Sequence, residues 1–128
     1  MNAEILIVDD SPVMRELCLR QVEKLGYTAV TVCDGLEALA AWEAADFSLI
    51  LMDVQMPKMD GLDATRLIRE RECAGGKHIP IVALTGFSDR ATCLAAGMDD
   101  FMAKPLSLKQ LSETLQSWLP TRALTESI

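Results

Sequence analysis

Acidic residues directly follow two of the most apolar stretches of the chain. Residues 49–52 read Leu-Ile-Leu-Met and run into Asp53. Residues 5–8 read Ile-Leu-Ile-Val and run into Asp9 and Asp10. Such runs are typical of strands buried on both faces of a sheet, and ligands collect outside the carboxyl ends of the strands in open α/β sheets. The sequence therefore predicts that three carboxylates meet at one edge of a sheet.

A cluster of carboxylates is unfavourable unless a cation compensates it. Two unit charges about 5 Å apart repel each other by roughly 3 kcal/mol at an effective dielectric constant near 20. Oxygen ligands with no Cys or His nearby select a hard ion, which here means Mg²⁺ or Mn²⁺. We expect two of the carboxylates, a backbone carbonyl from the region of Gln55 and water molecules to surround such an ion.

Two further polar residues are expected at the same edge. Thr85 follows the apolar stretch 79–84, and Lys104 follows residues 100–103. A lysine ammonium and a divalent cation would neutralise phosphoryl oxygens, and a threonine hydroxyl would donate a hydrogen bond to one of them. The implied chemistry is attack of the Asp53 carboxylate on phosphorus, which gives an acyl phosphate.

The rest of the chain must bring these residues together, and its pattern predicts five strands that alternate with five helices. Short apolar stretches predict strands over residues 4–8, 27–32, 49–53, 79–84 and 100–103. Helical spacing predicts helices over residues 12–25, 34–45, 60 through at least 68, 88–97 and 107–119, with a loop over 74–78. Buried strands with right-handed helical crossovers form a parallel sheet covered on both faces. We expect an α/β, flavodoxin-like doubly wound (βα)5 fold with strand order 2-1-3-4-5, which places strands one and three side by side.

The helix ends carry recognisable signals. Ser11, Asp34 and Ser107 are expected to cap the amino ends of three helices, and Gly26 is expected to end the first. Two helical stripes are expected to be buried, and they comprise Met14, Leu17, Cys18, Val22 and Leu25 in the first helix and Leu108, Leu111, Leu115, Trp118 and Leu119 in the last.

Composition narrows the class of protein. The 128 residues suit one domain, which we place at residues 1–120 with a tail or linker stub at 121–128. No apolar run approaches the roughly 18 residues that span a bilayer. Four scattered cysteines exclude the common zinc patterns and favour a cytoplasmic protein with reduced thiols. A net charge of −7 argues against nonspecific nucleic-acid binding.

Four short motifs occur in order along the chain. They are Val-Asp-Asp-Ser-Pro at 8–12, Leu-Met-Asp-Val-Gln-Met-Pro-Lys-Met-Asp-Gly at 51–61, Ala-Leu-Thr at 83–85 and Ala-Lys-Pro at 103–105. Over about residues 4–119 the chain resembles the receiver domain of two-component response regulators. The second motif is especially similar to receiver domains fused to hybrid sensor histidine kinases.

The resemblance implies a role for each residue of the predicted cluster. Asp53 would accept a phosphoryl group from a phosphohistidine. Asp10, Asp53 and the backbone carbonyl of Gln55 would hold Mg²⁺, and Asp9 would act largely through water. Thr85 and Lys104 would contact the phosphoryl group.

The resemblance also implies a switch. Thr85 and Phe101 fall at the family's switch positions, so the surface of the fourth helix, fifth strand and fifth helix would change on phosphorylation. The Lys104–Pro105 peptide would be cis. Gly86 stands where the family often has Ala, which predicts a mobile loop before activation.

The expected partner is a histidine kinase or a histidine phosphotransfer domain. We expect no contact with nucleic acid or membrane through this domain, and a monomer or a weak phosphorylation-dependent dimer. The domain would catalyse its own aspartyl phosphorylation and dephosphorylation without being an enzyme for an external substrate.

Three alternative functions can be distinguished from a phosphoacceptor receiver by particular residues of the sequence. A degenerate receiver would act only as a protein-interaction module, but every acceptor-site residue is present. A phosphatase of the haloacid dehalogenase type needs an acid two residues after the nucleophile, where this chain has Gln55. A flavodoxin-like redox carrier must cradle a phosphate after its first strand, where Asp9 and Asp10 would repel it.

Overall fold

Five parallel strands and five helices alternate along the chain. The computed structural model describes residues 4–54, 56, 59–75, 78–86, 90–104 and 107–119. The strands are β1 (Ile5–Val8), β2 (Ala29–Val32), β3 (Leu49–Asp53), β4 (Ile81–Thr85) and β5 (Asp100–Ala103). Hydrogen bonding places them in the order β2-β1-β3-β4-β5, and each neighbouring pair is parallel. The predicted fold class and strand order are confirmed.

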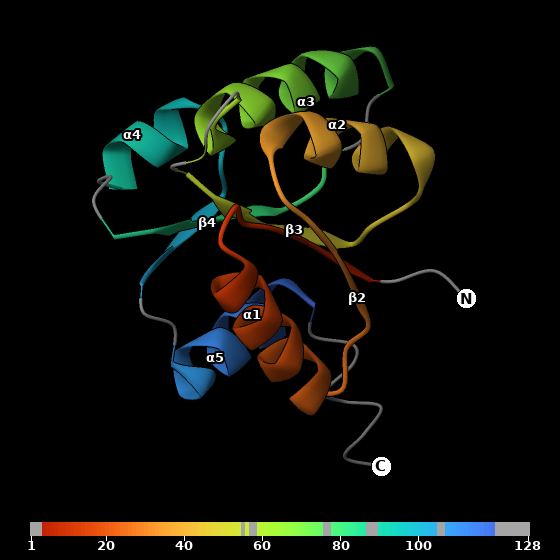
Figure 1. Ribbon diagram of the computed structural model, residues 1–128. Coiled ribbons are helices and arrows are strands. Elements are labelled where there is room, and N and C mark those ends of the chain that lie inside the picture. The colour runs from red at the N-terminus through yellow and green to blue at the C-terminus, as the bar shows by residue number, and fades with distance from the viewer. Residues whose placement is uncertain are drawn as a thin grey trace.

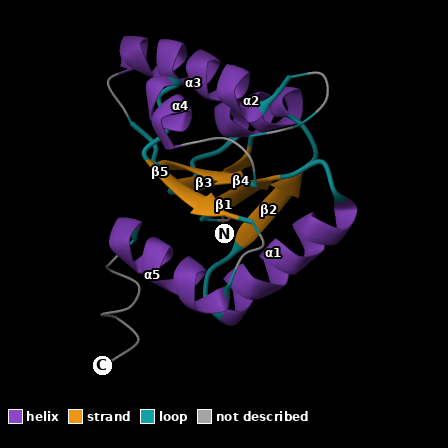
Figure 2. Cartoon of the chain, turned by 90° about the vertical axis from the view of Figure 1, so that its left-hand side faces the viewer, coloured by secondary structure: helices purple, strands orange, loops and turns teal. Residues whose placement is uncertain are grey.

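The helices form a layer on each face of the sheet. Figures 1 and 2 show α1 (Pro12–Lys24) and α5 (Leu108–Trp118) on one face. The other face is covered by α2 (Gly35–Ala44), α3 (Gly61–Gly75) and α4 (Arg90–Ala95). None of the helices in the described part of the chain is long and apolar enough to cross a membrane.

Alternation along the strands divides the core in two. Successive strand residues point to opposite faces, so Leu6 and Val8 of β1 pack with the layer of α2, α3 and α4. Ile5 and Ile7 pack with the layer of α1 and α5. Every residue of β1, β3 and β4 is buried. The two strands that end in Asp53 and Thr85, and the strand that Asp9 follows, are therefore the most deeply buried of the five described strands.

The predicted helix caps are confirmed by their hydrogen bonds. The side chains of Ser11, Asp34 and Ser107 each accept a hydrogen bond from the backbone N–H three residues later. Gly26 follows α1 with a φ of 95°, which is the left-handed region that favours glycine.

Two predicted strand starts are wrong by two residues, and the reason is the same in both. The N–H of Tyr27 donates to the carbonyl of Val22 in α1, so Tyr27 closes the helix and β2 begins at Ala29. The N–H of Ile79 donates to the carboxylate of Glu72, so β4 begins at Ile81. In each case a backbone donor that strand pairing would use has another acceptor.

Other corrections concern helix length and burial. The third helix extends to Gly75, past the predicted start of a loop at residue 74. Leu17 points outward with 40% of its surface exposed, although it was expected in the buried stripe. Of the five apolar residues expected on α5, only Leu111 and Leu115 are fully buried. Those two contribute roughly 3–6 kcal/mol as an upper bound.

The first testable prediction concerns a buried hydroxyl in α3. Thr65 is completely buried, and its Oγ1 has no hydrogen-bond partner in the described part of the chain. We expect Thr65→Val to raise the free energy of unfolding by about 1 kcal/mol, because it replaces an unsatisfied hydroxyl with a methyl group. Thr65→Ser is the control, since it keeps the hydroxyl and should lower stability. Urea unfolding measures both, and a Thr65→Val protein less stable than wild type would contradict the assignment.

Candidate functional site

Three carboxylates meet where β1 and β3 end. Val8 pairs with Met52 in the sheet, so the next residues along the two strands, Asp9 and Asp53, emerge side by side. Carboxylate oxygens of Asp9, Asp10 and Asp53 all lie within 4.8 Å of one another. Asp9 and Asp53 are buried, whereas Asp10 is exposed. The predicted convergence of the three acids is confirmed.

Lys104 is the cation of the cluster. It follows β5, and its Nζ lies 3.3 Å from Oδ2 of Asp9 and 3.0 Å from Oδ1 of Asp53. Burial alone would lower the pKa of Lys104, but its hydrogen bond to Asp53 and the charges of Asp53 and Asp9 outweigh burial and raise the pKa above 10.5. Lys104 is therefore a fixed positive charge shared between two buried acids.

The turn after β1 is held by hydrogen bonds to Asp9. Oδ1 of Asp9 accepts from the backbone N–H of Ser11 at 2.9 Å. The guanidinium of Arg15 in α1 donates to the backbone carbonyl of Asp9, also at 2.9 Å. Sequence reasoning missed Arg15, because no motif distinguishes it from the other polar residues of α1. Its contact fixes the backbone from which Asp9 and Asp10 project.

Thr85 and Phe101 lie on the two strands beyond Asp53. Thr85 ends β4, is buried, and pairs with Ala103 of β5. The N–H of Lys104 donates to the carbonyl of Thr85 at 3.0 Å, which ties the two residues together through their backbones. Phe101 pairs with Ala83, two residues earlier on each strand, and packs partly buried against the core beneath α2, α3 and α4.

Two glycines allow the backbone after β3 to approach its neighbours closely. A Cβ on Gly61 would lie 2.2 Å from the carbonyl oxygen of Asp53, and the Gly61 N–H donates to the carbonyl of Val54. A Cβ on Gly35, at the start of α2, would lie 2.5 Å from the carbonyl oxygen of Met59, which accepts from the Gly35 N–H. Gly61 stands in the second motif, but nothing in the sequence connects Gly35 with the site.

The sequence profile of the response regulator receiver domain matches residues 5–116. The chain belongs to the response regulator receiver family. It is thus a receiver domain and not a classical enzyme. The chain is 39% identical over 117 residues to the hybrid signal transduction protein dokA of Dictyostelium discoideum, with 91% of the chain and 7% of dokA covered. The chain spans only a small part of the curated relatives it matches, for example 7% of dokA and 17% of the CAI-1 autoinducer sensor kinase/phosphatase CqsS of Vibrio cholerae.

Solved structures agree with this assignment. The receiver domain of sensor histidine kinase PA1611 from Pseudomonas aeruginosa has a TM-score of 0.82 and 40% identity, with 92% of this chain and 98% of that one covered. That structure has a magnesium ion coordinated in its active site cleft. A co-crystal structure of the Saccharomyces cerevisiae histidine phosphotransfer protein Ypd1 with the receiver domain of Ssk1 gives a TM-score of 0.86 at 27% identity, covering 95% and 92%.

Several expectations about this receiver fall outside the described residues. They concern Gln55, the Lys104–Pro105 peptide, the start of the fourth helix at residues 88–89 and the tail at 121–128. Gly86 is described, and apart from its chain neighbours no atom of the described residues lies within 4 Å of the position its Cβ would take. Its φ is not in the left-handed region, so nothing in the local structure requires glycine there.

Two other reactive side chains take no part in the receiver's acid cluster. Cys18 of α1 is buried near Asp9, and burial together with that carboxylate raises the pKa of its thiol to about 12. Cys18 therefore stays protonated and is a poor nucleophile. His78 lies in the segment leading into β4, at the opposite end of that strand from Thr85, where its Nε2 is 2.7 Å from Oδ1 of Asp99.

The second prediction compares two glycines near the site. We expect Gly61→Ala to lower the free energy of unfolding by about 1–3 kcal/mol, because the added methyl group collides with the backbone of Asp53. Gly86→Ala is the matched control and should raise stability by about 0.4–1 kcal/mol, since the space is open and the φ is permitted. Chemical denaturation measures both, and equal stability of the two variants would show that Gly61 is not needed for close approach.

The third prediction uses the raised pKa of Lys104. A group whose pKa is higher in the folded state stabilises the fold fully below its unfolded pKa, and this stabilisation is lost as the pH rises through the folded pKa. The stability difference between wild type and Lys104→Met should thus be constant from about pH 7 to 9 and shrink above pH 10.5. Unfolding is followed with a chelator present, and Lys109→Met on the exposed face of α5 is the control. A difference that does not change above pH 10.5 would contradict the buried ion pairs.

Proposed function

We propose that this receiver takes a phosphoryl group from a phosphohistidine onto Asp53 in a two-component phosphorelay. The observation that carries the proposal is the position of Asp53, which ends the central strand β3 between Asp9, the residue after β1, and the ammonium of Lys104. Asp9 already directs Oδ1 to the N–H of its own turn, and Asp10 is exposed. Asp53 is therefore the acid with both the other carboxylates and the ammonium of Lys104 next to it, and we assign it as the acceptor.

The transfer needs no acid or base catalyst from the receiver. An oxygen of Asp53 forms a bond to phosphorus while the bond between phosphorus and the donor histidine nitrogen breaks, and the nitrogen keeps the electron pair. Lys104 lies within hydrogen-bond distance of Asp53, so its charge also reaches the oxygens of a phosphoryl group bound there. We assign the hydroxyl of Thr85, the last residue of β4, as a hydrogen-bond donor to one of those oxygens.

The donor set fits a magnesium ion, with manganese as the alternative. Asp9, Asp10 and Asp53 offer oxygen ligands only, and hard divalent cations prefer such ligands. We assign Asp10, Asp53 and the backbone carbonyl of Gln55 as direct ligands and Asp9 as a partner through water. When bound, the ion supplies positive charge next to the phosphoryl oxygens. The receiver domain of the sensor histidine kinase PA1611 has a magnesium ion in its active site cleft, which supports this assignment.

The signal leaves the site through β4 and β5. A phosphoryl group on Asp53 adds charge and acceptor oxygens beside Thr85. Movement of the Thr85 hydroxyl toward it would open space that the partly buried ring of Phe101 can fill. The surface of α4, β5 and α5 changes as a result. Phosphorylation biases an equilibrium that exists without it, because a ligand shifts populations only by its differential affinity for the two states.

The partner that delivers the phosphoryl group is a histidine kinase or a histidine phosphotransfer domain. It must present its histidine at the edge where β1 and β3 end, and α1 begins at that edge with two exposed apolar side chains. Val13 is 75% exposed and Leu17 is 40% exposed, and both line a shallow depression of about 450 Å³ with Pro12. We assign this face of α1 to the donor. The complex of Ssk1 with Ypd1 supports a partner of this class.

The fourth prediction tests the acceptor and the metal together. Incubation with acetyl phosphate and Mg²⁺ should add about 80 Da, the mass of one HPO₃ group, to the intact protein. We expect Asp53→Asn to abolish this species and EDTA to abolish it in wild type. Asp63→Asn, a change at an exposed acid of α3, should label normally. Intact-mass spectrometry measures the species, and undiminished labelling of Asp53→Asn would disprove the assignment.

The fifth prediction separates docking from chemistry. Val13→Asp should slow transfer from a phosphorylated histidine phosphotransfer protein at least about tenfold, since it places a charge in an apolar contact. Labelling by acetyl phosphate should be unchanged, because that donor needs no docking surface. Leu36→Asp on α2, where Leu36 is 51% exposed, is the control and should transfer normally. Equal loss with both donors would place the effect in the site itself.

A further inference from the structure

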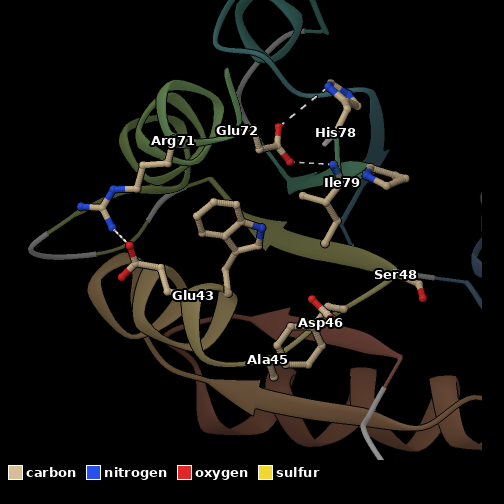
Figure 3. Close-up of a pocket in the computed structure, with 11 residues that line it drawn as sticks. Glu43, Ala45, Asp46, Ser48, Arg71, Glu72, His78 and Ile79 are labelled. Carbon is tan, nitrogen blue, oxygen red and sulfur yellow. Dashed lines mark hydrogen bonds and ion pairs between the residues drawn. The ribbon is translucent and has the colours of Figure 1, made fainter. Parts of the chain in front are cut away.

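A second concave site lies at the opposite end of the strands from the acid cluster. A cavity of about 740 Å³ opens between the carboxyl-terminal ends of α2 and α3 and the segments that lead into β3 and β4 (Figure 3). We call it the distal groove and define it by Trp42, Glu43, Asp46, Phe47, Arg71 and Pro80. It adjoins the first residue of β3, whereas Asp53 is the last, so roughly 13 Å of strand separates them. The groove is not part of the acid cluster.

Apolar side chains form much of the lining. Trp42 and Phe47 are partly buried and pack against the core beneath α2, α3 and α4. Ile79 and Pro80 line the same cavity from the segment before β4. Most ligand sites combine such an apolar lining with a few polar groups.

Most charged groups of the groove are already paired within the protein. Arg71 of α3 forms an ion pair with Glu43 of α2 (Figure 3). Glu72 accepts from the N–H of Ile79 at 2.6 Å, and its other oxygen is 2.6 Å from Arg69. These paired side chains hold α2, α3 and the segment before β4 in place, and they are not available to bind a ligand strongly.

Asp46 and Trp42 bring polar groups to the groove that are not paired in this way. Among the described residues, neither the carboxylate of Asp46 nor the indole N–H of Trp42 has a hydrogen-bond or ion-pair partner. An aspartate carboxylate can only accept hydrogen bonds, and an indole N–H can only donate one. The groove therefore offers an anionic acceptor and a neutral donor beside an apolar surface.

We propose that the distal groove binds a protein segment in which an apolar side chain lies next to a lysine or arginine. The apolar side chain would pack on Trp42 and Phe47, the cation would pair with Asp46, and a backbone carbonyl would accept from the Trp42 N–H. A cation is also attracted to the face of an indole ring.

Charge favours this occupant over others. Glu43 is paired with Arg71 and Glu72 with Arg69, so the carboxylate of Asp46 is the negative charge of the groove that has no cationic partner among the described residues. The whole chain carries a net charge of −7, which attracts basic segments and repels acidic ones. The inference is independent of the phosphorylation chemistry, because binding at one end of β3 leaves the other end open.

Tryptophan fluorescence provides the test. The chain has two tryptophans, so Trp118→Phe leaves Trp42 as the only indole. The probes are the peptides acetyl-Lys-Leu-Lys-Leu-amide and acetyl-Glu-Leu-Glu-Leu-amide, titrated in buffer containing Mg²⁺. We expect the basic peptide to shift the Trp42 emission in a saturable way and the acidic peptide to leave it unchanged. Asp46→Asn should weaken binding about fivefold. Asp53→Asn should bind like the parent, which separates this result from the phosphorelay.

A matched control and a second measurement identify the site. Glu113→Gln removes one exposed negative charge on α5, far from the groove, and should leave affinity unchanged. Amide ¹H–¹⁵N spectra of the unmodified chain should show peptide-induced shifts at residues 42–48 and 78–80. Absence of saturable binding, equal weakening by Asp46→Asn and Glu113→Gln, or shifts centred on residues 9–10 and 53 would each overturn the inference.

Discussion

The ammonium of Lys104 lies between two carboxylates that are almost completely removed from water, and the geometry of the site depends on this contact. Asp9 is 2% exposed and Asp53 is 3% exposed, and Nζ of Lys104 reaches both within 3.3 Å. Buried charges are tolerated only when they are paired, because desolvation of each ion is costly. The contact therefore ties the end of β5 to the ends of β1 and β3. A phosphoryl group on Asp53 would give Lys104 a new and more negative partner, so chemistry at one strand changes the restraint on another.

The backbone around Asp53 is restrained from both sides by close contacts that side chains would prevent. Gly61 approaches the Asp53 carbonyl from α3, and Gly35 approaches the Met59 carbonyl from the start of α2. The first turn of each helix thus supports the connection that follows β3. Arg15 restrains the neighbouring turn in the same way by donating to the Asp9 carbonyl. The three contacts come from three different helices. The position of the acid cluster therefore depends on how α1, α2 and α3 pack against the sheet.

Sequence reasoning succeeded where one physical rule dominates. Fully buried strands read as unbroken apolar runs, so β1 and β3, and with them the acids at their ends, could be predicted together with the strand order. It failed where a side chain from a distant segment decides the local structure. The carboxylate of Glu72 accepts a hydrogen bond from the N–H of Ile79, so β4 begins two residues later than predicted. Helical periodicity placed Leu17 in the core, but it cannot tell which part of a broad stripe faces the sheet. The roles of Arg15 and Gly35 depend on contacts across the fold that carry no local signal.

Attachment of α4 at one end constrains how a switch could work. Gly97 follows α4, and its carbonyl accepts from Arg69 of α3 at 2.8 Å. The same guanidinium pairs with Asp99 at 2.6 Å, and Asp99 in turn accepts from the N–H of Ile81 at the start of β4. This network fixes the carboxyl-terminal end of α4 to α3 and to the sheet. The amino-terminal end of α4 lies on the side of Thr85 and Gly86, and the contact described there is the longer, more exposed ion pair of Arg90 with Asp100 of β5, at 3.8 Å. A shift of Thr85 on phosphorylation would then move α4 mainly at its amino-terminal end. The helix would rotate about its Gly97 end, and it would not move as a whole.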